Sequence, residues 1–390
     1  MDQPITITGL GILSPLGIGV EETVAALREG EPALKTCGVQ SLPFSPLCGE
    51  VPAFRIEEWL AAPKTYIDRN SELLLAAVGM ALRHAGLDCA TRDPERIGIL
   101  AGTAWSGLDT MSAFFADYLQ KGPRLVKPLL FPHAYYNTAV SLAAIEWSLR
   151  GPHQSFASGR AAAAQALIAA RDLLADDEAD VLLAGGSEAL STTRFHLLSA
   201  QQALLPEGIT SAHIFDACHA GTIPGEAGVV LVLERRDHAV ARGAKPLAII
   251  RGGGLGPTGA AGAADAIRAA LQEAGIAPAE LACVCASANG CPALDNAEAW
   301  ALRETLAGAP VPVIAPAALC GDTGGVCGAL HAALAVLLRA AGNLPPVAGL
   351  ATPAVPGLAY VTTPATELRR GPILVLAMDL DGTSAALVLE

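Results

Sequence analysis

Residues 151–189, GPHQSFASGRAAAAQALIAARDLLADDEADVLLAGGSEA, contain the pattern that decides the fold. A glycine turn leads into an alanine-rich helix over 161–177, and a buried strand follows from Asp180. Alanine is the best helix former, and alternating strands and helices are typical of a mainly parallel sheet covered by helices. The tip of such a turn often carries a nucleophile, because the helix N-terminus favours negative charge. Here the tip is Arg160, which cannot attack a carbonyl carbon.

A similar order of elements returns after about residue 240. Predicted strands and helices alternate again, and a glycine-rich turn, LCGDTGG (319–325), leads into the helix VCGALHAALAVLLRAAG (326–342). This turn occupies a place in the second half comparable to that of the turn around Arg160. The correspondence predicts an internal duplication, with an N-terminal half at 1–240 and a C-terminal half at 241–390.

The composition indicates a soluble protein with a large core or an extensive subunit interface. Of the 390 residues, 52% are hydrophobic and 16% are charged, and the formal charge is -13. This acidic balance, without a cluster of Lys or Arg, argues against a nucleic-acid partner. No run of about 18 uncharged apolar residues is present, and the start, MDQPITITGL, lacks the basic region of a signal peptide. We therefore expect a cytoplasmic protein without a membrane span.

The nine cysteines do not follow a metal-binding pattern. Their number is odd, no CxxC pair occurs, and the CVC at 283–285 is typical of a buried strand. We therefore expect reduced thiols and no metal site. The glycine turn at 9–17 lacks the GxGxxG of a dinucleotide site, and no cofactor is expected.

Five segments, in this order along the chain, resemble the β-ketoacyl-ACP synthases of the thiolase superfamily. They are ITITGLGILSPLG (5–17), the approach to the central turn (122–152), the strand DEADVLLAGGSEA (177–189), IFDACHAGTIPGEAGVVLVLE (214–234) and LDGTSAALVLE (380–390). The resemblance covers almost the whole chain. It implies an α/β, thiolase-like fold with five layers, αβαβα, two pseudo-repeated halves and a dimer formed through a central strand.

The same resemblance implies that the catalytic residues of the family are missing. Arg160 stands at the position of the catalytic cysteine, Asn289 at the first histidine and Asp322 at the second, while Ala317 replaces a lysine. Condensation needs a thiolate to hold the acyl chain and imidazoles to stabilise the enolate. No catalytic residue is therefore expected at these degenerate positions.

Two interpretations of Arg160 stand beside each other. A buried guanidinium needs a carboxylate partner, so Arg160 and Asp322 are expected to form an ion pair inside the former active site. Alternatively, Arg160 is a solvated residue without a role, since arginine is seldom buried unpaired.

A relocated nucleophile is a further alternative at this place. Cys291, Cys320 and Cys327 all fall near the degenerate site by the same resemblance, and Cys291 and Ala293 replace the threonines that hold a pantetheine arm. Small buried thiols are more often packing residues, and no histidine lies beside any of them in the sequence.

A helix predicted at 107–120 carries Leu108, Met111 and Phe115 on one face. Such a stripe equally fits core packing. The chain also resembles chain-length factors, the inactive ketosynthase-like subunits of type II polyketide systems, in which the matching helix lies at the dimer interface. The resemblance implies that the three side chains line the acyl tunnel of the partner, and that Leu380 belongs to a gate-like C-terminal loop.

The function implied is that of a silent, chain-length-factor-like subunit, without enzymatic activity of its own. It would pair with an active ketosynthase, shape the tunnel for a growing polyketide or polyene chain, and meet the acyl carrier protein only through the complex. The alternatives are an acyl-transferring or decarboxylating enzyme with a relocated nucleophile, a homodimeric acyl-binding protein, and a scaffold.

Overall fold

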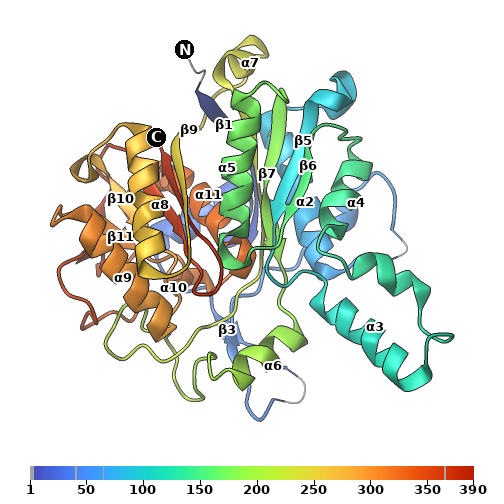
Figure 1. Cartoon of the computed structure of the whole chain (residues 1–390), viewed down its shortest axis with the longest axis horizontal. Coiled ribbons are helices and arrows are strands. Elements are labelled where there is room, and N and C mark those ends of the chain that lie inside the picture. The colour runs from blue at the N-terminus through green and yellow to red at the C-terminus, as the bar shows by residue number, and fades with distance from the viewer. Residues whose placement is uncertain (1–3, 40–41, 65, 364–365) are drawn as a thin grey trace.

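The computed structural model describes residues 4–39, 42–64, 66–363 and 366–390, and its main feature is one mixed sheet (Figure 1). In the described ranges this sheet has twelve strands. In the order of pairing they are β13 (Ala359–Tyr360), β11 (Pro312–Ile314), β10 (Cys283–Cys285), β15 (Ile373–Ala377), β16 (Ser384–Leu389), β9 (Ala248–Gly256), β1 (Ile5–Ser14), β8 (Ala227–Arg235), β7 (Val181–Glu188), β5 (Ile97–Gly102) and β6 (His153–Phe156), with β2 (Gly17–Ile18) beside β1. Two further pairs are β3 (Lys35–Thr36) with β4 (Leu47–Cys48), and β12 (Asn343–Leu344) with β14 (Thr366–Glu367).

The two halves of this sheet repeat one topology. The N-terminal half has the order β6-β5-β7-β8-β1, and the C-terminal half has β11-β10-β15-β16-β9. Along these five strands, in the order given, both halves have two parallel pairings followed by two antiparallel ones. The C-terminal half has one further parallel strand, β13, outside β11. The halves meet where Ile5–Ile7 pair antiparallel with Ala248–Ile250. The predicted repeat is therefore confirmed, while its boundary at 240/241 stays a prediction.

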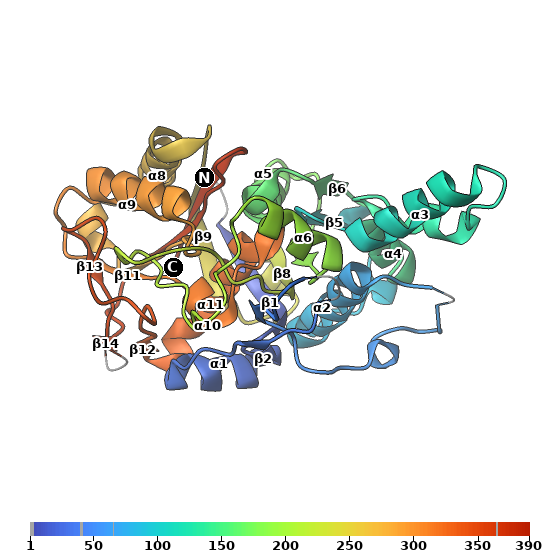
Figure 2. The ribbon, with the colours of Figure 1, turned by 90° about the horizontal axis from the view of Figure 1, so that it is seen from below.

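Helices cover the sheet in three layers, as Figures 1 and 2 show. The α-helices are α1 (Gly19–Glu29), α2 (Arg69–Ala85), α3 (Leu108–Lys121), α4 (Thr138–Glu146), α5 (Ala162–Ala175), α6 (Thr192–Ala200), α7 (Arg236–Ala241), α8 (Gly259–Ala274), α9 (Pro292–Leu306), α10 (Ala317–Cys320) and α11 (Cys327–Ala341). One apolar core lies between α2, α4 and the N-terminal strands, and another between α8, α9 and the C-terminal strands. A third, around α5 and α11, draws on strands of both halves. This is the predicted five-layered, thiolase-like arrangement.

The central layer depends on small side chains. A Cβ on Gly328 of α11 would lie 2.7 Å from the Cβ of Ala164 in α5, so the two helices approach each other closely. The alanine run therefore serves close packing as well as helix propensity. The segment Gly324–Ala341 is long and apolar enough to cross a membrane by length and composition, but 83% of it is buried inside the protein. A core helix meets the same criteria, so this segment is no argument for a membrane span.

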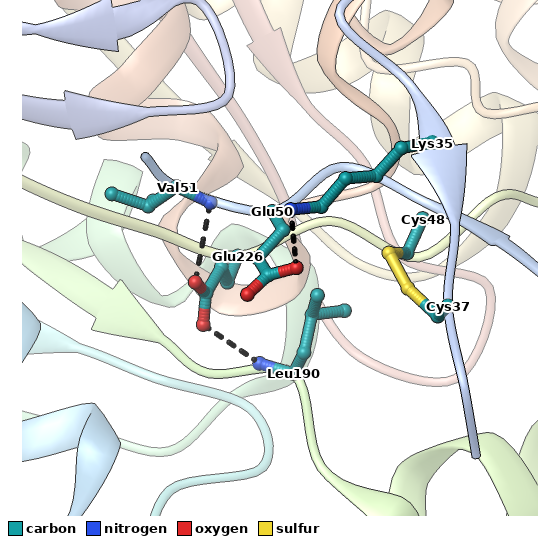
Figure 3. Close-up of a disulfide and its surroundings, with 7 residues drawn as sticks. All are labelled: Lys35, Cys37, Cys48, Glu50, Val51, Leu190 and Glu226. Carbon is teal, nitrogen blue, oxygen red and sulfur yellow. Dashed lines mark hydrogen bonds and ion pairs between the residues drawn. A yellow bond between two sulfur atoms is a disulfide. The ribbon is translucent and has the colours of Figure 1, made fainter. Parts of the chain in front are cut away.

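One disulfide departs from the expected reduced thiols (Figure 3). Cys37 and Cys48 are bonded, with their Cα atoms 6.0 Å apart. The hairpin of β3 and β4 pairs Lys35 with Cys48, which brings Cys37 into reach at the end of β3. The expectation of nine free thiols is wrong because strand register, rather than sequence spacing, determines which cysteines meet. The other cysteines are free: Cys89, Cys218, Cys283, Cys285, Cys291, Cys320 and Cys327.

Candidate functional site

Arg160 lies at the tip of the turn between β6 and α5, as the sequence predicts. The turn is a short 3-10 segment, Gly159–Ala161, in which Gly159 has φ +70. A Cβ on Gly159 would lie 2.0 Å from a carboxylate oxygen of Asp379, so the turn requires glycine for space as well as for conformation. The turn thereby directs residue 160 toward the centre of the molecule.

The backbone N–H and all three side-chain nitrogens of Arg160 donate hydrogen bonds. Its Nη1 donates to the Asp322 carboxylate and its Nη2 to the carbonyl oxygen of Ser287. Nε donates to the carbonyl oxygen of Met378 at 3.1 Å, and the backbone N–H donates to Asp379 Oδ2 at 2.8 Å. The side chain is 12% exposed. The predicted ion pair with Asp322 is confirmed, and the alternative of a solvated arginine is wrong.

Asp322 is shared among several donors. Asn289 Nδ2 donates to its Oδ2 at 3.1 Å, and the backbone N–H of Gly324 donates to its Oδ1 at 3.1 Å. Burial alone would raise the pKa of Asp322, but Arg160, followed by Arg194, lowers it below its ordinary value. The structure thus brings together the three degenerate positions, Arg160, Asn289 and Asp322, as one ion-paired cluster.

Arg194 is a member of this cluster that sequence reasoning missed. It comes from α6, its side chain is 1% exposed, and its Nη2 lies 3.8 Å from Asp322 Oδ2. Its guanidinium also donates to the carbonyl oxygens of Gly225 and Asp322, at 3.0 and 2.8 Å. A single arginine in a short helix carries no sequence signal of burial, so only the packing of α6 reveals this role.

A cavity of about 370 Å³ opens beside the cluster. Leu380, the predicted gate residue, lines this cavity together with Trp105, Leu294 and Cys291. Leu380 itself is half-buried. The C-terminal loop thus lines the cavity beside Arg160, Asn289 and Asp322, while the gate role of Leu380 stays a prediction.

The buried thiols near the cluster are poor nucleophiles. Burial raises the pKa of Cys320 to about 12, and it does the same for Cys327 although Arg160 opposes the shift. Cys327 Sγ lies 3.2 Å from the carbonyl oxygen of Arg160. Both side chains remain protonated at neutral pH, and a thiol is far less reactive than a thiolate. Neither supports a relocated nucleophile.

The predicted tunnel residues lie away from the Arg160 cluster, in α3. This helix spans Leu108–Lys121, one residue later than predicted, and Thr110 is its buried residue. Leu108 and Met111 are half-buried, and Phe115 is 51% exposed. The structure keeps the three residues on one helix but does not bring them to the degenerate site. Such exposure does not fit ordinary core packing.

The exposed apolar side chains around α3 form a surface of their own, here called the α3 surface. Its members are Phe115, Tyr118, Leu119, Leu125, Leu129, Phe131, Tyr135 and Tyr136. Phe131 stacks against Phe114 and Tyr135, with ring centroids 5.5 and 5.0 Å away. The lobe that carries them projects from the body of the protein (Figures 1 and 2). A contiguous exposed apolar patch marks an interaction site.

In the described sheet, β6 is the last strand beside this lobe, with β5 as its paired neighbour. Its first two residues, His153 and Gln154, are exposed. An open strand edge presents unpaired N–H and C=O groups and is a template for pairing with another chain. The open edge and the α3 surface both belong to the N-terminal half.

Among the described residues, no group of three or more His, Cys, Asp and Glu side chains is placed to hold a metal ion. The ionisable groups of the cluster instead bind one another. The ion pair can hold the turn at Gly159–Ala161 against the turn that carries Asp322. Among the described residues of the cluster, the side chains of Arg160, Asn289 and Asp322 are all hydrogen-bonded.

Comparisons with known proteins agree with this architecture. Residues 2–239 match the N-terminal domain of β-ketoacyl synthases and residues 251–351 match the C-terminal domain. The chain is 33% identical to the tetracenomycin polyketide synthase ketoacyl synthase beta subunit of Streptomyces glaucescens, over 99% of this chain and 98% of that protein. It is 26% identical to 3-oxoacyl-[acyl-carrier-protein] synthase 2 of Coxiella burnetii, with the same coverage.

Solved structures give the same result. A chain of the ishigamide ketosynthase/chain length factor superposes with a TM-score of 0.93 at 26% identity, covering 100% of this chain and 99% of that one. A chain of the complex AntDE:AntF, described as a type II PKS acyl-carrier protein with its ketosynthase, superposes with a TM-score of 0.87 at 22% identity, covering 100% of both chains. The latter likeness concerns the fold alone.

Proposed function

The chain belongs to the β-ketoacyl synthase family, and from this premise we propose that it is a subunit of the chain-length-factor type that catalyses no condensation. It pairs with an active ketosynthase as a soluble cytoplasmic complex and closes the far end of the acyl tunnel. The acyl carrier protein reaches it only through that complex.

The observation that carries this proposal is the bonding of Arg160. The family needs a nucleophile at this turn, and an arginine whose side-chain nitrogens are all engaged supplies none. The backbone N–H of residue 160, at the start of a helix, is the type of donor that stabilises a developing oxyanion. Here that N–H is already bonded to the Asp379 carboxylate. A tetrahedral intermediate at this place would meet carboxylates instead of free donors.

The α3 surface supports the second part of the proposal. A monomer that exposes so many neighbouring aromatic and aliphatic side chains is expected to bury them against a partner. The polyketide synthase relative is named a ketoacyl synthase beta subunit, and the ishigamide structure is a ketosynthase with a chain length factor. These names favour a ketosynthase as the partner. In this proposal Leu108, Met111 and Phe115 face its acyl chain.

The test is reconstitution with the ketosynthase encoded beside this chain. The purified chain alone should neither condense nor decarboxylate malonyl-ACP, and mass spectrometry after incubation with acyl-ACP should show no acyl adduct on any cysteine. The 1:1 complex should condense. As a control, replacing the nucleophilic cysteine of the ketosynthase by alanine should abolish condensation, because the chemistry belongs to that subunit.

Each competing function has its own outcome in this experiment. An acyl adduct on Cys291 would favour an enzyme with a relocated nucleophile. A stable homodimer that ignores the ketosynthase but binds acyl chains would favour a stand-alone binding protein, and full ketosynthase activity without this chain would leave only a scaffold.

A further inference from the structure

The disulfide at the β3–β4 hairpin joins two segments that are held to the rest of the protein with unequal strength (Figure 3). The segment that follows Cys48 is bonded to the body of the protein. The Glu226 N–H donates to the Gly49 carbonyl oxygen at 2.9 Å, and the Val51 N–H donates to Glu226 Oε1 at 3.2 Å. These bonds fix the position of Cys48.

The segment that carries Cys37 is held more weakly. Its backbone N–H donates to the Pro46 carbonyl oxygen at 2.8 Å. Lys35 pairs with Glu50 at 2.7 Å, but the two side chains are 58% and 46% exposed, and an exposed ion pair contributes little to stability. Both residues of β3 are exposed. The disulfide therefore acts where the other contacts of the hairpin are weak.

The two cysteines also differ in their access to solvent. Cys48 is 0% exposed, whereas Cys37 is half-buried. Cys37 lines a cavity of about 350 Å³, together with Gly38 and Glu50. A space of this size admits a small molecule. A small thiol can therefore approach the disulfide from the side of Cys37.

Helix α6 packs against the same disulfide. Cys48 and Phe195 of α6 belong to one buried apolar cluster, and Cys37 packs against this cluster. Phe195 also lines the cavity, as do Ser191 and Thr192 at the start of α6. The disulfide is thus part of the surface on which α6 rests.

Helix α6 is bonded in turn to α3. The Asp109 carboxylate of α3 accepts from the backbone N–H groups of Thr192 and Thr193, each at 3.0 Å. The hydroxyls of Ser112 and Thr193 lie 3.1 Å apart and bond each other. Helix α6 therefore connects the hairpin with the helix that carries part of the α3 surface.

The location of the chain bears on the role of this disulfide. The proposed function, on which this inference rests, places the chain in the cytoplasm. Thiol pools keep cysteines reduced there, and the disulfides of mesophilic cytosolic proteins are usually transient and catalytic or redox-sensing. Exposed disulfides are also the more easily reduced ones. The partial exposure at Cys37 fits a disulfide that opens and closes.

We propose that Cys37–Cys48 is a thiol-exchange site, and that its redox state controls how firmly α6 is held. The thiolate of a small thiol attacks Cys37 Sγ, the S–S bond breaks, and Cys48 leaves with the electron pair and takes up a proton. A second thiolate attacks the small-thiol sulfur of the mixed disulfide and releases Cys37, which is protonated in turn. Two small thiols are thereby oxidised to one disulfide, and the protein disulfide is reduced to two thiols.

Reduction acts first on the weakly held end of the hairpin. A disulfide restricts the freedom of the chain that it closes, so its loss lets the segment around Cys37 open more often. Helix α6 then loses part of its support, and the bonds from Thr192 and Thr193 pass this change to α3. We expect the reduced chain to bind the ketosynthase more weakly than the oxidised chain.

The first experiment measures the exchange on the purified, folded chain. The chain is equilibrated with glutathione and glutathione disulfide in varied ratios, free thiols are blocked with N-ethylmaleimide, and peptides are analysed by mass spectrometry. We expect the folded chain to be reduced by glutathione. The mixed disulfide should form on Cys37 in at least about tenfold excess over Cys48, because reactivity follows exposure.

Three variants locate the exchange. Cys48→Ala should accumulate the glutathione adduct on Cys37, since no second protein thiol is left to displace it. Cys37→Ala should give at least about tenfold less adduct, on the buried Cys48. Cys218→Ala is the matched control, because Cys218 is a free, exposed cysteine, and it should leave the exchange at Cys37 unchanged. If Cys48→Ala does not fold, the wild-type distribution of the adduct decides the same point.

The second experiment measures the effect on α6 and on association. Reduction should speed amide hydrogen exchange of residues 35–39 by about fivefold or more and that of α6 by about twofold or more, while β8 should not change. It should weaken the ketosynthase complex by about threefold or more in sedimentation analysis. The double variant Cys37→Ala with Cys48→Ala should bind like the reduced chain and should not respond to glutathione.

Three results would overturn the inference: reduction only after the chain unfolds, an adduct on Cys48 in place of Cys37, or equal hydrogen exchange of α6 in both redox states. These readouts need no ketosynthase, so they are separable from failure of the proposed function. A chain that forms no complex but shows exchange at Cys37 and the response of α6 refutes the heterodimer and keeps the redox site. An active complex with equal affinity in both states refutes the redox control alone.

Discussion

The Arg160 cluster and the α3 surface differ in how their side chains are covered: the first is buried and hydrogen-bonded, and the second is apolar and exposed. In the cluster, each side-chain nitrogen of a buried arginine donates to a carboxylate or to a backbone carbonyl group. On the α3 surface, Leu119 is 80% exposed. The first region ties its charged groups to one another, while the second leaves apolar side chains uncovered. Under the proposed function, the chain acts through its surface and not through chemistry at Arg160.

The largest expected effect comes from breaking the cluster. Arg160→Ala should lower the free energy of unfolding by about 3–5 kcal/mol, because it leaves the buried Asp322 carboxylate without its main partner. The double variant with Asp322→Ala should recover part of this loss. Urea unfolding followed by circular dichroism gives both values. Arg150→Ala, at an exposed arginine, is the control and should change stability by less than about 0.5 kcal/mol.

Strictly additive effects of Arg160→Ala and Asp322→Ala would mean that the two side chains do not interact energetically. The Arg160 cluster would then not be held together by this ion pair.

The next largest effect concerns the α3 surface and its role in association. Leu119→Asp should leave the stability of the isolated chain within about 0.5 kcal/mol of wild type, since the side chain is exposed. It should weaken the ketosynthase complex by about tenfold or more, because a charge would be buried in the interface. Sedimentation analysis measures the association. Val240→Asp in α7, a residue 61% exposed at the opposite end of the molecule (Figure 1), is the matched control. Equal loss of binding in both variants would refute the α3 surface as the interface.

A smaller and more specific effect concerns product length. Phe115→Ala should open space at the end of the tunnel, because rigid surroundings do not fill a cavity completely. The complex should then release chains longer by several carbons at a similar rate. Met111→Trp should shorten them. The measurement is the product distribution of the reconstituted complex with malonyl-ACP. An unchanged distribution with intact complexes would remove α3 from the tunnel.

The smallest expected effect is a pair of opposed pH dependences within the buried core. Burial lowers the pKa of His331 to about 4 and raises that of Glu298 to about 7. Between pH 4.5 and 6.5 the unfolded chain holds an extra proton on His331, whereas the folded chain holds one on Glu298. The histidine therefore makes stability rise with pH and the glutamic acid makes it fall, each by up to about 1.4 kcal/mol per unit.

These two slopes mask each other in the wild type. Glu298→Gln should expose the rise with pH, and His331→Gln should expose the fall, in unfolding curves measured from pH 4.5 to 6.5. Leu119→Asp, in the exposed region, should follow the wild-type profile in this window. Parallel profiles for all four proteins would show that neither buried group titrates as described.

The sequence predicted the elements and the meeting of Arg160, Asn289 and Asp322, and it missed contacts that depend on register and packing. The helix at 107–120 was placed within one residue. The pairing of Arg160 with Asp322 followed from the resemblance to β-ketoacyl-ACP synthases, which places both residues in one site, and from the need of a buried guanidinium for a carboxylate. Arg194 and Asp379 were missed, because each reaches the cluster from an element whose local sequence has no distinguishing pattern. The Cys37–Cys48 disulfide depends on the register of a short hairpin, which sequence spacing does not specify.

The position of β1 between the two halves has a consequence for how the protein is made. The Thr6 hydroxyl bonds to the Glu234 carbonyl oxygen, 228 positions later in the chain, and the other edge of β1 pairs with β9. During synthesis β1 therefore stays unpaired until β8, near the end of the first half, and β9, at the start of the second, have been made. Such non-local pairing folds slowly, and a strand with open edges invites aggregation during synthesis. We expect a chain truncated at residue 240 to need a chaperone, although it contains a complete copy of the repeated topology.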